Sequence, residues 1–149
     1  MSNLSSSVKF DVIRGWPHGS AVDESVAPAP GVEVQEGQLV TLGATGAALV
    51  SSVPTEGGTA RTMFRMVIQG NDQSDADFVG KVVVLRGDLT VETEKFVAGA
   101  YAVGDYVTAS AGVGTEGYIT VRTGANEQIV GQVEAYDATA GVLTVALKL

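Results

Sequence analysis

From residue 32 onward, apolar side chains recur at alternate positions, which is the period of a strand with one buried face. The clearest alternations lie at 32–34, 82–84, 89–91 and 142–147, in stretches rich in Val, Thr, Ile and Tyr, which strands prefer. Glycine-containing turn signals separate these stretches at intervals of roughly 8–12 residues, as in sandwiches and barrels. The pattern predicts an all-β fold, with a single small β-barrel or β-sandwich domain over residues 32–149.

Residues 1–31 have a different character from the rest of the chain. Three of the four prolines fall here, together with a serine run at 5–7. Proline fixes φ, removes an amide donor and pushes the preceding residue towards extended geometry. The alternation over residues 8–13 is the one strand-like signal in this segment. We therefore predict an extended N-terminal arm with room for one short strand.

The β region contains a faint internal repeat. Three pairs of segments resemble each other in the same order, namely 36–42 with 103–109, 78–84 with 129–135, and 88–91 with 141–145. A duplication would give two similar halves that close one barrel. The alternative is that glycine turns followed by Val and Thr recur by chance in any β protein. No helical stripe stands out, and residues 72–78 are the best candidate for a short helical turn.

Charge and composition narrow the classes of partner. The chain has a net charge of −8, and charged residues make up 17% of it, below the roughly 25% of an average domain. Because Lys and Arg form no run or basic face in the sequence, we expect neither nucleic acid nor an anionic membrane as a partner. The high apolar content of 45% favours a surface covered by copies of the chain or by another protein. No signal peptide and no apolar stretch of membrane-spanning length is visible, which predicts a soluble protein.

The sequence offers little catalytic chemistry. There is no cysteine, and the only histidine, His18, lies between Pro17 and Gly19 in the predicted arm, without a partner to orient it. The oxygen-rich stretch 71–77 lacks the EF-hand order, which favours a solvated loop over a bound cation. The glycine-aspartate pair within 86–88 lies between two apolar runs and predicts a hairpin turn. We expect no enzyme activity, no cofactor and no metal.

Six residues are the candidates for an interface with a partner or with another copy. Met63, Phe64 and Arg65 belong to the most concentrated apolar and basic stretch, and these residue types are enriched at contact cores. Phe10 and Ile13 are apolar residues of the strand-like stretch 8–13 in the predicted arm. Trp16 is the only tryptophan, and it has two possible roles: it packs back on its own domain, or it docks into a neighbouring subunit.

Several stretches of the sequence resemble bacteriophage capsid decoration (cement) proteins. They are 83–96, 101–108, 129–135 and 140–145, and the similarity extends over roughly residues 32–149. The resemblance implies a structural virion protein on the outer surface of the capsid, made in the host cytoplasm. It implies binding to the major capsid protein, self-association as a dimer or trimer, and stapling of neighbouring capsid subunits. The arm resembles the extended termini that tie such proteins to the shell.

Two other functions fit the same sequence features. A tail or baseplate β-barrel adaptor or tube protein would share the strand pattern but would form closed rings. A receptor- or glycan-binding module would need exposed aromatic side chains, and aromatic residues are 6% of this chain.

Overall fold

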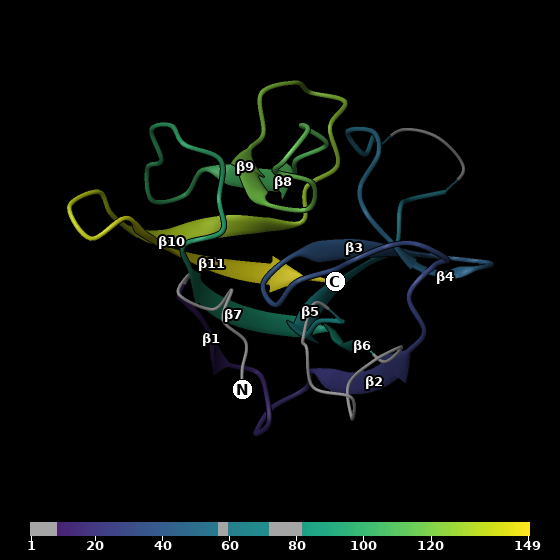
Figure 1. Ribbon diagram of the computed structural model, residues 1–149. Coiled ribbons are helices and arrows are strands. Elements are labelled where there is room, and N and C mark those ends of the chain that lie inside the picture. Colours follow the sequence, from purple (N-terminus) through teal and green to yellow (C-terminus); the bar gives the residue numbers. More distant parts are fainter. Residues whose placement is uncertain (1–8, 57–59, 72–81) are drawn as a thin grey trace.

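The computed structural model describes residues 9–56, 60–71 and 82–149, which form eleven strands and no helix (Figure 1). Sheet A contains, in order across the sheet, β1 (Phe10–Arg14), β7 (Asp88–Thr93), β11 (Val142–Lys148), β10 (Gly131–Asp137), β8 (Tyr106–Ala109) and β9 (Ile119–Val121). Sheet B contains β2 (Val22–Val26), β6 (Val82–Arg86), β5 (Phe64–Gln69), β3 (Leu39–Gly43) and β4 (Gly46–Ala48). All strand pairs within these sheets are antiparallel. The all-β prediction is confirmed, and the two separate sheets make the fold a sandwich and not a closed barrel.

The main core lies between the two sheets. Strand β11 shows how the sequence builds it, because Leu143, Val145 and Leu147 are buried while the residues between them are more exposed. Each strand of this kind turns alternate side chains towards the opposite sheet. Sheet B contributes Leu39, Phe64, Met66 and Leu85 to the same cluster, and sheet A adds Leu89, Val91, Val107, Ile119 and Val133.

Sheet B is also buried on its second face. Val34, Val40, Val67, Val82 and Val84 form a smaller cluster there, beneath the chain that follows β2. That chain pairs with the outer edge of β4, where the Ala47 amide donates to Ala27 and the Ala29 amide donates to Ala47. Burial on both faces explains why residues 82–85 of β6 are all apolar and do not alternate with polar residues.

The chain passes directly from one sheet to the other at Gly87. Strand β6 ends in sheet B at Arg86, and β7 begins in sheet A at Asp88. Gly87 has a φ of +112°, and an added Cβ would meet the Cα of Ala21 at 3.0 Å. The predicted hairpin turn at 86–88 is therefore wrong. The two flanking strands do not pair with each other, because the glycine makes a corner between sheets.

The N-terminal segment is part of both sheets over its described residues. Strand β1 pairs with β7 in sheet A, and β2 pairs with β6 in sheet B. The loop between β1 and β2 crosses the β6–β7 corner, and Trp16 in this loop packs against the main core. The structure thus differs from the extended arm predicted for residues 1–31. Strands β7 and β6 each have an edge that is free to pair, and β1 and β2 occupy those two edges. Residues 1–8 lie outside the described residues.

The segments of the proposed internal repeat are arranged differently from one another. Strands β10 and β11 form a hairpin, whereas their counterparts β6 and β7 lie in different sheets. The shared Gly, Val and Thr pattern therefore accompanies two different local topologies. The predicted helical turn at 72–78 falls outside the described residues.

We predict that Gly117→Ala lowers the free energy of unfolding by about 3 kcal/mol, because it adds a clash to an unfavourable backbone conformation. Gly117 has a φ of +77°, and its added Cβ would overlap the carbonyl oxygen of Leu39. Gly114 is the matched control, since it has a φ of +88° but open space around it. Gly114→Ala should cost about 1 kcal/mol, from backbone conformation alone. Equal losses in urea unfolding would show that the contact at Leu39 is unimportant.

We also predict that Trp16→Ala lowers the free energy of unfolding by about 1–3 kcal/mol, since the half-buried ring covers the main core. The control is His18→Ala in the same loop, where the side chain is exposed and the change should stay within about 0.5 kcal/mol. Thermal unfolding of both variants would compare them. An unchanged stability for Trp16→Ala would mean that the ring does not hold the loop to the sandwich.

Candidate functional site

A groove of about 310 Å³ opens at one end of the sandwich, where β5 begins and where β6 and β11 end. Its lining comes from four parts of the chain that are remote in sequence, namely Arg61–Arg65, Arg86, Gln128 with Val130, and Lys148 with Leu149. The groove therefore exists only because the fold brings these strand ends together.

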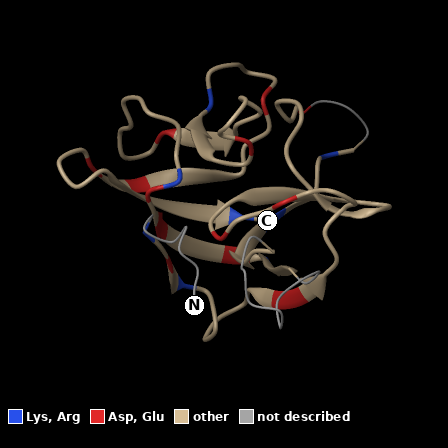
Figure 2. Cartoon of the chain, in the orientation of Figure 1, with Lys and Arg blue, Asp and Glu red and all other residues tan. Residues whose placement is uncertain are grey.

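The lining of this groove carries an unusual charge. It holds four of the nine Lys and Arg residues of the chain and no acidic side chain, although the chain has seventeen Asp and Glu residues. Figure 2 shows blue segments beside the C-terminus, and red segments both near it in this view and over the other strands and loops. The groove is thus a local basic site on a protein of net charge −8. We call it the cationic groove.

The four basic side chains of the cationic groove differ in their partners. Arg65 donates from Nε to Glu24 at 2.9 Å, and Arg61 donates from Nη2 to Glu56 at 2.6 Å. Arg86 and Lys148 are exposed and have no ion pair among the described residues. Neither cation would therefore lose an ion pair with a described residue on binding a ligand.

Apolar side chains line the groove beside these charges. Met63 is 59% exposed, whereas Phe64, the next residue, is 3% exposed and belongs to the main core. Strand alternation explains the difference, because Phe64 and Met66 of β5 point inward and Arg65 points the other way. The prediction that Phe64 is a surface contact therefore needs correction, since its side chain supports the groove from within.

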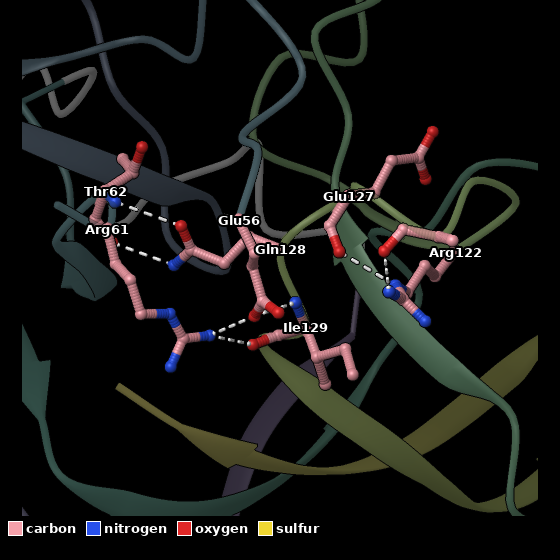
Figure 3. Close-up of polar contacts among 8 residues, drawn as sticks. Glu56, Arg61, Thr62, Arg122, Glu127, Gln128 and Ile129 are labelled. Carbon is pink, nitrogen blue, oxygen red and sulfur yellow. Dashed lines mark hydrogen bonds and ion pairs between the residues drawn. The ribbon is translucent and has the colours of Figure 1, made fainter. Parts of the chain in front are cut away.

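A buried glutamine fixes the wall of the groove (Figure 3). The Gln128 side chain accepts from the Thr62 amide at 3.0 Å and donates to the Thr62 carbonyl at 2.9 Å. The backbone amide of Gln128 donates to the Pro54 carbonyl at 2.9 Å. This side chain therefore mimics a strand partner and satisfies both backbone groups of Thr62.

Arg61 is tied to the same wall. Figure 3 shows its guanidinium between the Glu56 carboxylate and the Ile129 carbonyl, to which Nη2 donates at 3.0 Å. Glu56 in turn accepts from the Ile129 amide at 3.1 Å. Nearby, Arg122 donates from Nε to the Glu127 carbonyl at 2.7 Å, which holds the adjoining turn. The bonds to Glu56 and Ile129 orient Arg61 before any partner binds.

A second depression, of about 380 Å³, adjoins the cationic groove and shares Arg61, Val130 and Lys148 with it. Tyr106, which is 48% exposed, lines it together with Gln132. Tyr106 and Gln132 are cross-strand partners on β8 and β10. An exposed aromatic ring beside an amide and charged groups is a polar surface that the sequence did not single out.

The structure brings together only some of the residues predicted as an interface. Met63 and Arg65 line the cationic groove, whereas Phe10, Ile13 and Trp16 do not. Ile13 is 44% exposed on β1, while Phe10 and Trp16 pack against the main core. Of the two roles considered for Trp16, packing on its own domain is the one that the structure displays.

Tyr101 and Lys9, which lie outside the groove, have a shifted pKa. Burial raises the pKa of Tyr101 to about 12, and its ring packs edge-on against Phe96 and Tyr136. A hydrogen bond with Glu92 raises the pKa of Lys9. The Tyr101 hydroxyl donates to the Val97 carbonyl, so this group has a structural role in holding the loop that follows β7.

The described residues contain no group of three His, Asp or Glu side chains placed to hold a metal ion. His18 is exposed, and residues 72–77 of the oxygen-rich stretch 71–77 lie outside the residues that the structure describes. Within the described ranges, no helix has the length and apolarity needed to cross a membrane. No protein-family model, curated protein or solved structure matches this chain.

We predict that Gln128→Ala lowers the free energy of unfolding by about 2 kcal/mol, because it leaves the amide and carbonyl of Thr62 without their partner. Gln132→Ala is the control, since Gln132 is exposed and its side chain makes one hydrogen bond within the described residues, to the Gly104 carbonyl. Its effect should stay below about 1 kcal/mol. Urea unfolding of the two variants would compare them, and similar losses would contradict a special role for Gln128.

Proposed function

We propose that this chain is a structural virion protein of a bacteriophage, which binds the outside of the mature capsid and staples neighbouring major capsid subunits. The cationic groove is the observation that carries the proposal. It gathers four basic side chains and the exposed Met63 at one end of the sandwich, which suits a contact with another protein. The resemblance of residues 83–96, 101–108, 129–135 and 140–145 to decoration proteins supports the same function.

The physical basis of such a staple is mass action. A protein that binds the assembled lattice more tightly than its separated subunits stabilises the lattice. Many symmetric copies then convert modest single contacts into a large total effect, through avidity. Self-association as a dimer or trimer would let one oligomer reach several capsid subunits. In this proposal the protein acts through binding alone, without catalysis or a cofactor.

The all-β sandwich suits a particle component in another respect. Strand β4, at one edge of sheet B, is covered by residues 27–29 of the same chain. A covered edge does not offer free amide and carbonyl groups to another copy. This arrangement supports a protein that is held at high local concentration on a shell without uncontrolled edge-to-edge pairing.

Glycan binding is a second candidate function, and the depression beside Tyr106 favours it. A half-exposed aromatic ring next to Gln132, Glu56 and Arg61 offers a stacking face together with donors and acceptors for hydroxyl groups. A tail or baseplate adaptor is the remaining alternative, and a closed ring seen in solution would favour it.

We predict saturable binding of the purified protein to capsids stripped of their decoration, at a fixed ratio to the major capsid subunit. Co-sedimentation of particles would measure the bound copies. Met63→Gln should weaken binding about five-fold or more, since the exposed side chain contributes apolar contact. Trp16 emission should stay unchanged on binding, because the ring is already packed on its own core.

Val113→Gln is the matched control for this experiment. Val113 is 99% exposed on a loop outside the cationic groove, so the same chemical change should leave capsid binding intact. Absence of binding to every capsid form would reject the decoration function. The next measurements would then be oligomeric state, for the ring of a tail protein, and a glycan array, for the depression beside Tyr106.

A further inference from the structure

We propose that the cationic groove binds an acidic segment of a partner protein, in which two or more carboxylates flank an apolar side chain. The inference shares one assumption with the proposed function, namely that the cationic groove is the contact site. It specifies the chemistry of the bound segment and does not require that the partner be a capsid protein.

Charge complementarity is the first argument. Elsewhere the acidic residues outnumber the basic ones, so a free carboxylate is repelled by most of the surface of a chain with net charge −8. In the cationic groove the lining side chains are basic or uncharged. At physiological ionic strength charges are screened over about 8 Å, so the local groups dominate the interaction with a ligand inside the groove.

The available donors are the second argument. Arg86 and Lys148 have no ion pair among the described residues. The Arg65 side chain donates from Nε to Glu24 and from Nη1 to the Phe64 carbonyl. Those bonds hold the guanidinium in place, so a carboxylate that approaches it meets an oriented donor. Preorganised donors lose less conformational entropy on binding than free side chains do.

The position of Arg86 and Lys148 is the third argument. Each ends a strand beside the β6–β7 corner, and the backbones of Gly87 and Leu149 are hydrogen-bonded to each other in both directions at 2.9 and 3.0 Å. The two cations therefore stand on one rigid unit, although 62 residues separate them in sequence. Both line the same groove, so one acidic segment bound there can contact both.

The apolar surface specifies the remainder of the ligand. Met63 is exposed at the groove, and Phe64 and Val130 lie beneath it as buried side chains. Methionine adapts its shape to different apolar partners. An apolar residue between the carboxylates would cover Met63, which adds contact that a simple anion cannot provide. Phosphate groups of a nucleic acid would meet the same cations, but the net negative charge of the chain opposes a long polyanion.

The test is an NMR titration of the isotope-labelled full chain with a capped peptide of four glutamates around one leucine. We expect saturable shifts at the amides of Met63, Gly87 and Leu149, and at least a ten-fold weaker interaction with the glutamine version of the peptide. The double variant Arg86→Gln with Lys148→Gln should weaken binding about ten-fold, as expected for the loss of two charge-assisted contacts. Raising the salt concentration should weaken it further.

The matched control is the double variant Lys9→Gln with Arg14→Gln, which changes the net charge by the same amount outside the cationic groove. It should leave the titration unchanged. Equal binding of the glutamine peptide, shifts confined to other surfaces, or tighter binding of a single-stranded oligonucleotide of equal charge would each overturn the inference. Peptide binding without capsid binding would reject the decoration function alone. Capsid binding together with no preference for the glutamate peptide over its glutamine version would reject the acidic-segment inference alone.

Discussion

One backbone pair, between Gly87 and Leu149, extends the β7–β11 ladder of sheet A to the residue at which β6 of sheet B turns into β7. The amide of each residue donates to the carbonyl of the other, so the end of β11 in sheet A is tied to the end of β6 in sheet B. Glycine is required at the corner because its φ is positive and Ala21 lies against it. The loop that carries Trp16 crosses over this corner, and β1 and β2 then pair with the two strands that leave it. The side of the sandwich is closed in this way.

The proposed function depends on the same corner. Arg86 and Lys148 are the residues next to the linked pair, and the corner fixes both at one end of the molecule. The wall opposite them is held by a different set of bonds, in which Gln128 pairs with Thr62 and Arg61 is tied to Glu56. A rigid corner and a bonded wall give a groove whose charge is set before binding. That property suits a protein that recognises an assembled surface and undergoes no chemical step.

Local sequence patterns predicted much of the strand content, and long-range pairing accounts for most of what they missed. The alternation of β11 and the apolar and basic stretch at 61–66 could be read directly, and the stretch does contribute Met63 and Arg65 to the groove. The local sequence around Gly87 is the same for a hairpin turn and for a corner between sheets. The two differ only in whether β6 and β7 pair with each other, which depends on distant parts of the chain. Residues 10–26 looked like an arm because their pairing partners lie more than 50 residues away.

The groove itself could be predicted only in part. Nothing near Arg86 or Lys148 in the sequence indicates that the two residues meet, and the buried role of Gln128 depends on a contact 66 residues away. Phe64 illustrates the opposite error. Its residue type suggested a contact, but strand alternation turned the side chain into the core. Residue composition predicts that the protein has a contact surface, whereas the location of that surface can be found only from the fold.

Native-state hydrogen exchange at the amides of Gly87 and Leu149 tests this account most directly. If the corner holds the sheets and the groove together, both amides should exchange only through global unfolding, with the same free energy as the amides of β11. Rapid exchange of the two amides, through local opening while β11 stays protected, would contradict the account. The groove would then lack the rigid unit on which its basic side chains are placed.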